Sequence, residues 1–142
     1  MVDQGRREAV KNRLHILTNV RQWRILVTSN PIGAYAKMIF VETSIFTRQV
    51  QKLLTDDEYR ELQQALVNRP DAGAVMVGSG GLRKIRWAKE GRGKSGGVRV
   101  IYYWAVSSEQ ILMLFMYPKG EQDNLTSAQT KMLRQIVEEE YP

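Results

Sequence analysis

The twenty residues from Gly80 to Arg99 hold seven basic residues and one acidic residue. Outside this segment the chain has 14 basic and 14 acidic residues, so the formal net charge of +6 comes from the segment alone. Cations gathered in this way neutralise phosphates, which favours recognition of a polyanion, with nucleic acid as the first choice. The alternative is a merely solvated basic strand and loop. The seven residues are Arg83, Lys84, Arg86, Lys89, Arg92, Lys94 and Arg99.

The rest of the composition removes several kinds of site. The chain has no cysteine and a single histidine, His15, which excludes thiolate ligands, a cysteine nucleophile, a histidine pair and a histidine-rich zinc site. Any catalysis must therefore use Lys, Arg, Tyr, Glu or Asp side chains. No apolar run approaches the roughly 18 residues of a membrane span, and the N-terminus lacks the apolar core of a signal peptide. We expect a soluble, cytoplasmic protein.

One glycine motif within the basic segment resembles a phosphate-binding loop. Gly93-Lys94-Ser95 is part of that pattern, but the pattern requires a glycine five residues earlier, where Ala88 stands. It also requires a helix next, and a strand is expected there. We interpret residues 90–97 as a flexible basic loop between two strands.

Capping signals and hydrophobic spacing predict three helices after residue 38. Thr43 or Ser44 begins the first helix, which reaches Leu54. The capping box from Thr55 to Glu58 opens the second helix, which ends near residues 68–70. A third helix is expected over 126–139. Its inner face is predicted to carry Ala128, Met132, Leu133 and Ile136.

Strands are predicted at 39–41, 82–89, 98–106 and 110–117. The order of elements predicts an α+β fold, in which a mainly antiparallel β-sheet packs on an N-terminal helix hairpin and a C-terminal helix. Residues 38–142 are interpreted as one compact domain. Residues 1–37 are interpreted as an N-terminal appendage or an over-called start, with a basic helix over 5–20 and a short strand at 23–27.

Side chains alternate along a strand, so the expected sheet has two different faces. One face is apolar and lies under helices. The other is open, and its cations and tyrosine rings suit RNA, because rings stack on unpaired bases. The apolar face carries Ile85, Trp87, Val98, Val100, Tyr102 and Trp104. The open face carries Lys84, Arg86, Arg99 and Tyr103, and Tyr117 and Lys119 share one side at the end of the last strand.

Two runs of the chain carry a resemblance to the RelE/ParE superfamily of bacterial toxins: GGLRKIRWAKEGRGKSGGVRVIYYW and ILMLFMYPKGEQDNLTSAQ. Within that superfamily the chain is most similar to the HigB-type branch. The shared features are a G-x-R-K-x-R pattern, a Gly- and Lys-rich loop, an R-V-I-Y-Y run and a Y-x-K-x-E-x-x-N-L-T ending. The similarity covers about residues 39–141 and none of residues 1–37. It implies the RelE-like microbial RNase fold.

The resemblance further implies a toxin of a type II toxin–antitoxin system. Such a toxin is a ribosome-dependent endoribonuclease that uses no metal or other cofactor, cleaves translated mRNA and so inhibits translation. The 2′-hydroxyl of the RNA attacks the adjacent phosphate, so the protein must bend the strand, assist proton removal and stabilise charge. The partners implied are the ribosome, mRNA and a neutralising antitoxin, expected to be a helix-turn-helix DNA-binding protein.

The same resemblance implies catalytic roles for four cations. Lys84 matches a lysine that acts as general base or electrostatic stabiliser, and Arg86 matches another basic position of the motif. Arg99 matches the arginine that holds the scissile phosphate. Lys119 stands at the late basic position associated with leaving-group or charge stabilisation.

Other residues are expected to contact RNA or the ribosome. The tyrosine that stacks on a base in some family members falls nearest Leu125 here, so Tyr103 or Tyr117 is expected to substitute. The full set of expected contacts is Arg83, Lys89, Arg92, Lys94, Tyr103 and Tyr117.

Two alternatives stay open at this stage. The first is a non-catalytic ParE-like toxin that binds a protein target such as DNA gyrase. The second is a plain RNA-binding module. The four cations named as catalytic favour the nuclease, because a toxin that binds a protein target has no need of cations around one phosphate.

Overall fold

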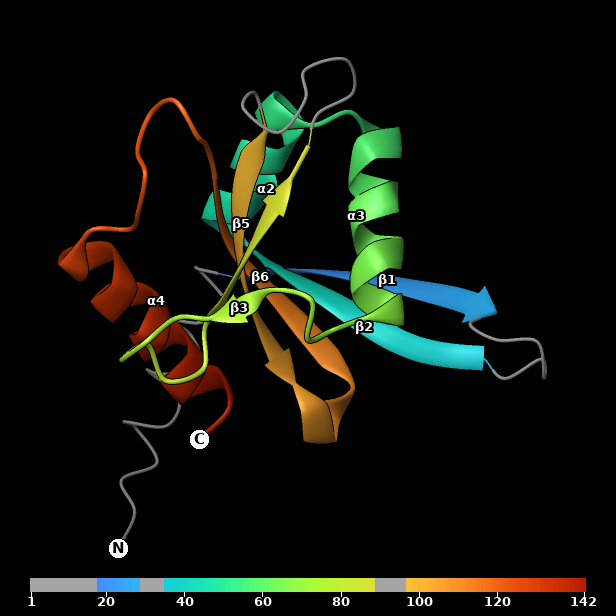
Figure 1. Ribbon diagram of the computed structural model, residues 1–142. Coiled ribbons are helices and arrows are strands. Elements are labelled where there is room, and N and C mark those ends of the chain that lie inside the picture. Colours follow the sequence, from blue (N-terminus) through green and yellow to red (C-terminus); the bar gives the residue numbers. More distant parts are fainter. Residues whose placement is uncertain (1–17, 29–34, 89–96) are drawn as a thin grey trace, which may run out of the picture.

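The computed structural model describes residues 18–28, 35–88 and 97–142 (Figure 1). Most of the helix predicted over 5–20 lies outside these ranges, as do His15 and the loop cations Lys89, Arg92 and Lys94. The strands are β1 (Thr18–Thr28), β2 (Tyr35–Thr43), β3 (Ala74–Val75), β4 (Arg83–Trp87), β5 (Val98–Ala105) and β6 (Gln110–Pro118). The helices are α2 (Ser44–Leu53), α3 (Asp56–Asn68) and α4 (Ser127–Glu140), with a short 3-10 turn, η2 (Val106–Ser108).

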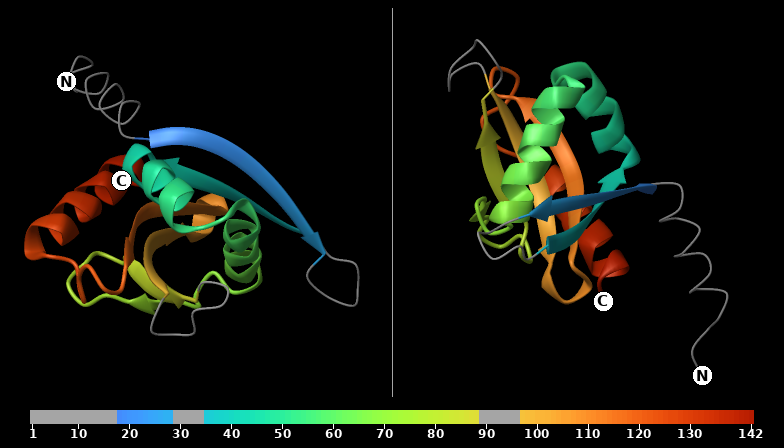
Figure 2. Two further views of the ribbon diagram at one scale, coloured as in Figure 1. Left: turned by 90° about the horizontal axis from the view of Figure 1, so that it is seen from above. Right: turned by 90° about the vertical axis from the view of Figure 1, so that its right-hand side faces the viewer.

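The strands form one mainly antiparallel sheet in the order β1-β2-β6-β5-β4-β3. Only β2 and β6 pair in parallel, through Ile39–Glu42 against Gln110–Met113. The predicted α+β class and the predicted strands are confirmed, and β6 is a central strand with both faces largely buried. The strand expected at 23–27 is part of β1, which pairs with β2 at the edge of the sheet. Figures 1 and 2 show these two strands running out beyond the other four.

Both helix starts of the N-terminal hairpin are fixed by threonine caps, as the sequence predicts. The Thr43 hydroxyl accepts a hydrogen bond from the Phe46 amide at 3.1 Å, which makes Thr43 the N-cap of α2. Thr55 and Glu58 form a reciprocal capping box that opens α3. Among the described residues, no helix is both long enough and apolar enough to cross a membrane.

Helices cover both faces of the sheet, so the expectation of one open face is wrong. Helices α2 and α3 lie over the face that holds Val98, Val100 and Tyr102, as predicted. Helix α4 packs on the opposite face, where it buries Ile101 and Leu112 in a second apolar cluster. Figure 1 shows α4 and α3 on opposite sides of β5 and β6. Alternation along a strand distinguishes the two faces, but it does not tell whether a distant helix docks on the second one.

The inner face of α4 differs from the predicted one by a rotation of the helix. Leu133, Ile136 and Val137 are buried at the i, i+3, i+4 spacing of a packed helix. Ala128 and Met132 are exposed, so their assignment to the inner face was wrong. The polar loop before α4 lies over the end of β6, where the Tyr117 hydroxyl contacts the Asp123 carbonyl.

Two irregularities fix the course of β5 and β6. The pairing register shifts between Ile101 and Tyr102, where β6 contains one extra residue, so that Leu114 and Phe115 both belong to the cluster under α4. Helix α2 covers the part of the β6 edge that β2 does not reach. There the Met116 amide donates to Gln49 Oε1 at 2.8 Å, and the Thr43 hydroxyl donates to the Leu114 carbonyl at 2.8 Å.

Candidate active site

A row of polar side chains crosses the three strands β4, β5 and β6. Arg86 pairs with Arg99, and Arg99 pairs with Tyr117. Residues directly opposite each other on paired strands project from the same face, so these three side chains share the face on which α4 packs. Lys84 stands opposite Ile101, one position along on that same face. The structure therefore brings together Lys84, Arg86 and Arg99 as the alternation predicts.

Arg99 is the most unusual group of the row, because its charge is buried. The residue is 5% exposed, and its Nη1 atom has no hydrogen-bond partner among the described residues. A guanidinium is always charged, and an unpaired buried donor costs free energy. The three ion pairs found in the described part of the chain, Arg60–Asp57, Arg69–Asp71 and Arg134–Glu138, lie elsewhere. Arg99 thus has a buried donor that no described residue satisfies.

Tyr117 lies beside Arg99 and is buried even more deeply, with 2% of its surface exposed. Burial raises the pKa of the Tyr117 phenol, and the positive charge of Arg99 opposes that shift. The hydroxyl donates a long bond of 3.5 Å to the Asp123 carbonyl in the loop that leads to α4. A ring covered in this way cannot stack on a base in this conformation. The burial of this ring was not predicted from the sequence.

Lys84 is half-buried and is held by the same loop. Its Nζ atom donates to Asn124 Oδ1 at 3.0 Å. Asn124 was not predicted as a site residue, because nothing in the local sequence pattern connects a loop amide to a strand lysine far away in the chain. The contact exists because α4 and its preceding loop dock over the face that was expected to be open.

Lys119 follows the end of β6 and is exposed. Its backbone amide donates to the Gly97 carbonyl at 3.3 Å, which fixes the chain beside the first residues of β5. Gly97 itself lies against β4, where a Cβ atom would stand 2.4 Å from the Trp87 carbonyl oxygen. This close approach holds the ends of the three strands together, with Lys119 two residues beyond Tyr117.

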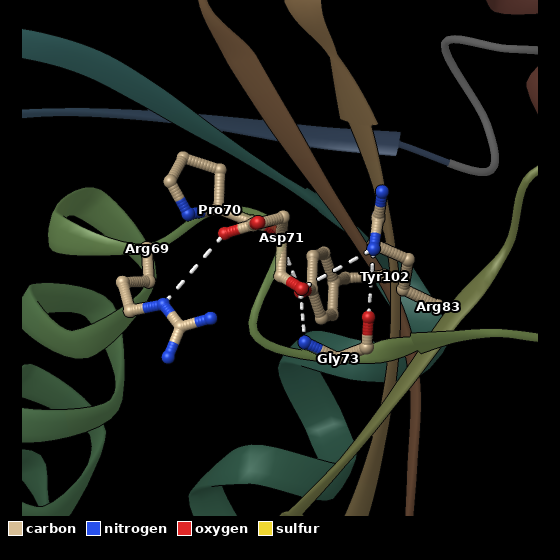
Figure 3. Close-up of polar contacts among 6 residues, drawn as sticks. All are labelled: Arg69, Pro70, Asp71, Gly73, Arg83 and Tyr102. Carbon is tan, nitrogen blue, oxygen red and sulfur yellow. Dashed lines mark hydrogen bonds and ion pairs between the residues drawn. The ribbon is translucent and has the colours of Figure 1, made fainter.

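Arg83 lies on the other face of the sheet from Lys84. Its Nη1 atom donates to the carbonyls of Gly73 at 2.8 Å and Asp71 at 3.3 Å (Figure 3). In the same cluster the buried Tyr102 hydroxyl accepts from the Gly73 amide at 2.8 Å and donates to the Pro70 carbonyl at 2.7 Å. Arg83, which the sequence predicts to contact RNA, thus binds the segment between α3 and β3 in the structure, and its contact with RNA stays a prediction.

Tyr103 is far along β5 from the buried arginine. It is half-buried, and its ring packs against that of Tyr141 with centroids 5.5 Å apart. Arg99 and Tyr103 are four residues apart on one strand, which corresponds to about 13 Å. Tyr103 therefore does not join the row around Arg99. In the described part of the chain, no group of three acidic or histidine side chains could hold a metal ion.

The fold and this face define a small α+β protein with a half-buried cationic site beside a buried arginine whose Nη1 atom has no hydrogen-bond partner among the described residues. The family model of the RelE toxin of the RelE/RelB toxin–antitoxin system matches residues 37–140. The chain belongs to the RelE toxin family, and the match covers every strand and helix from β2 to α4 except the first two residues of β2. An antitoxin partner follows from that membership.

Proposed function

We propose that this protein is a HigB-type toxin that cleaves mRNA on the translating ribosome and so inhibits translation. The observation that carries the proposal is the buried residue Arg99, which is 5% exposed and whose Nη1 atom has no hydrogen-bond partner among the described residues. Lys84 and Arg86 project from the same face, and no acid among the described residues forms an ion pair with any of the three. Such a group of cations suits the extra charge of a phosphorane.

The reaction needs no nucleophile from the protein. The 2′-oxygen of the RNA forms a bond to the adjacent phosphorus, the bond from phosphorus to the 5′-oxygen breaks, and a 2′,3′-cyclic phosphate remains. Lys84 in its neutral form takes the proton of the 2′-hydroxyl. Arg99 and Arg86 bind the non-bridging oxygens, and Lys119 supplies charge or a proton to the departing 5′-oxygen.

The partners follow from this reaction. The protein acts in the cytoplasm, on mRNA held in the decoding site of the ribosome. Three basic loop residues dock on ribosomal RNA: Lys89, Arg92 and Lys94. Tyr103 and Tyr117 stay candidates for RNA contact, although Tyr117 has to be uncovered before it can stack. The antitoxin is a helix-turn-helix protein that silences the toxin.

The toxin domain in this proposal is residues 38–142, with residues 1–37 as an appendage. The family match supports this division, because it begins at residue 37. The test is thermal unfolding of the 38–142 fragment beside the full chain. A cooperative transition and retained cleavage are expected, whereas an unfolded fragment would contradict the division.

The nuclease proposal is tested by mapping the 5′ ends of transcripts after brief expression of the toxin. Wild type should create new ends within translated regions. Arg99→Ala and the more conservative Arg99→Gln should create none, because both remove the buried charge. Arg60→Ala is the matched control, since Arg60 is an exposed arginine of α3, on the other side of the sheet. Equal cleavage by Arg99→Gln and wild type would overturn the assignment of Arg99.

A further inference from the structure

Among the described residues, Asn124 is the loop residue whose side chain forms a hydrogen bond with one of the four candidate catalytic cations. Its Oδ1 atom accepts from Lys84 Nζ at 3.0 Å. We propose that Asn124 is a positioning residue, which holds the Lys84 amine beside the Arg99 row while leaving that amine free to lose a proton. This inference rests on the proposed nuclease function.

The position of Asn124 is itself fixed by a chain of hydrogen bonds. Its carbonyl accepts from Gln122 Nε2 at 3.0 Å, and the same nitrogen donates to Gln129 Oε1 at 3.1 Å. Gln129 is the third helical residue of α4 and forms a capping box with Thr126. The loop is therefore anchored to the end of a helix that is packed on the sheet.

A second tether joins this loop to the row across the strands. The Tyr117 hydroxyl contacts the Asp123 carbonyl at 3.5 Å, and Tyr117 pairs with Arg99 across β6 and β5. The adjacent residues Asp123 and Asn124 therefore contact β6 and β4, the two strands that flank β5. The loop thus holds Lys84 from the face on which α4 packs, and its contact with Tyr117 fixes the loop next to Arg99.

The chemical type of the acceptor matters as much as its place. A neutral amide oxygen accepts one N–H from an amine in either protonation state, so the contact persists when the amine gives up a proton. A carboxylate at the same place would favour the charged ammonium form. An asparagine therefore orients the nitrogen without stabilising the protonated state that a general base must leave.

The test compares four full-length variants: Asn124→Ala, Asn124→Asp, Asp123→Asn and the double exchange Asp123→Asn/Asn124→Asp. The double exchange moves the carboxylate by one residue and keeps the net charge. Two measurements are made on each variant. The first is mRNA cleavage on translating ribosomes between pH 6.5 and 8.5. The second is NMR titration of the lysine side chains of the isolated toxin, which does not depend on activity.

Asn124→Ala should lower the maximal cleavage rate at least tenfold with less than a threefold change in KM, because ribosome docking lies elsewhere. Asn124→Asp and the double exchange should both raise the titration midpoint of Lys84. Their pH–rate profiles should move to higher pH by the same amount, with about a tenfold loss near pH 7 that is recovered as the pH rises. Asp123→Asn should leave both midpoints in place.

Two results would overturn the positioning role while leaving the nuclease intact. The first is a wild-type rate for Asn124→Ala in a preparation where Arg99→Gln is inactive. The second is an unchanged Lys84 titration in both Asn124→Asp and the double exchange. If wild type itself leaves mRNA whole, the proposed function falls and the positioning role falls with it, whatever the titration shows.

Discussion

Arg86 and Arg99 are direct partners across β4 and β5, so two like charges leave neighbouring positions on one face of the sheet. Like charges directly opposite each other on paired strands are destabilising, by roughly 0.2–1 kcal/mol. No acid among the described residues forms an ion pair with either arginine. The pairing lowers stability and raises the positive charge density of this face. Such a loss of stability is common at sites of binding or catalysis.

This relationship predicts opposite effects on stability and activity. Arg86→Gln should keep or raise the free energy of unfolding, by up to about 1 kcal/mol, because it removes the repulsion. The same variant should cleave mRNA at least tenfold more slowly. Urea unfolding and ribosomal cleavage measure the two effects. A variant that loses stability and keeps full activity would show that Arg86 is structural.

The hydroxyl of Tyr102 should contribute to stability and have no part in cleavage. Tyr102→Phe leaves the Gly73 amide and the Pro70 carbonyl without their partner (Figure 3). Loss of such bonds at a buried site costs about 1–3 kcal/mol. Urea unfolding should show that decrease at an unchanged cleavage rate per folded molecule. A wild-type unfolding midpoint would contradict the role assigned to the cluster.

Arg83 provides a related test, since it binds the same segment through the Gly73 and Asp71 carbonyls. Arg83→Gln should lower the unfolding midpoint and leave the salt dependence of ribosome binding unchanged. A smaller slope of binding against salt concentration, with normal stability, would instead restore Arg83 to the RNA-binding surface expected from the sequence.

The raised pKa of Tyr141 leads us to expect a loss of stability at high pH. Burial, the Glu140 charge and Tyr103 together raise the pKa of Tyr141 from 10.0 to about 12. The unfolded chain thus loses this proton before the folded protein does, so the contribution of Tyr141 to stability is present below pH 10 and is lost between about pH 10 and pH 12. Tyr141→Phe should show a smaller decrease in unfolding midpoint over that interval. Equal decreases in the unfolding midpoints of wild type and Tyr141→Phe would show that Tyr141 is not the group responsible.

Gln49 should hold the end of β6, the strand that carries Tyr117 and leads into Lys119. Gln49→Ala removes the acceptor of the Met116 amide and should cost about 1 kcal/mol of stability. Gln49→Glu keeps an acceptor oxygen at that place and is the matched control. Hydrogen exchange of the Met116 amide reports the effect directly, and it should be faster in the alanine variant alone.

Local patterns in the sequence predict much of this fold. The threonine caps of α2 and α3 are local signals, and they give the correct helix starts. The alternation along β4 and β5 is local too, and it correctly groups Lys84, Arg86 and Arg99 on one face. The docking of α4 is a long-range event. Its register on the sheet depends on which apolar residues fit the second cluster, and so the burial of Tyr117 could not be read from alternation.

The sequence therefore predicts the cations that share the face, but it does not predict the loop residues that contact them. The contact from Lys84 to Asn124 and the cover over Tyr117 both arise where a loop lies over the sheet. A loop has no periodicity from which contacts across the chain can be inferred. The resemblance to toxins supplied the roles of the cations, but it could not indicate which groups hold them in place.

The most direct test of the central claim uses purified toxin, translating ribosomes and an mRNA whose cleavage products are analysed for their end groups. We expect wild type to cut the translated RNA and leave 2′,3′-cyclic phosphate ends, while Arg99→Gln leaves the RNA whole and Arg60→Ala cuts it normally. Intact mRNA in the presence of folded wild type, together with poisoning of DNA gyrase by the same preparation, would contradict the account.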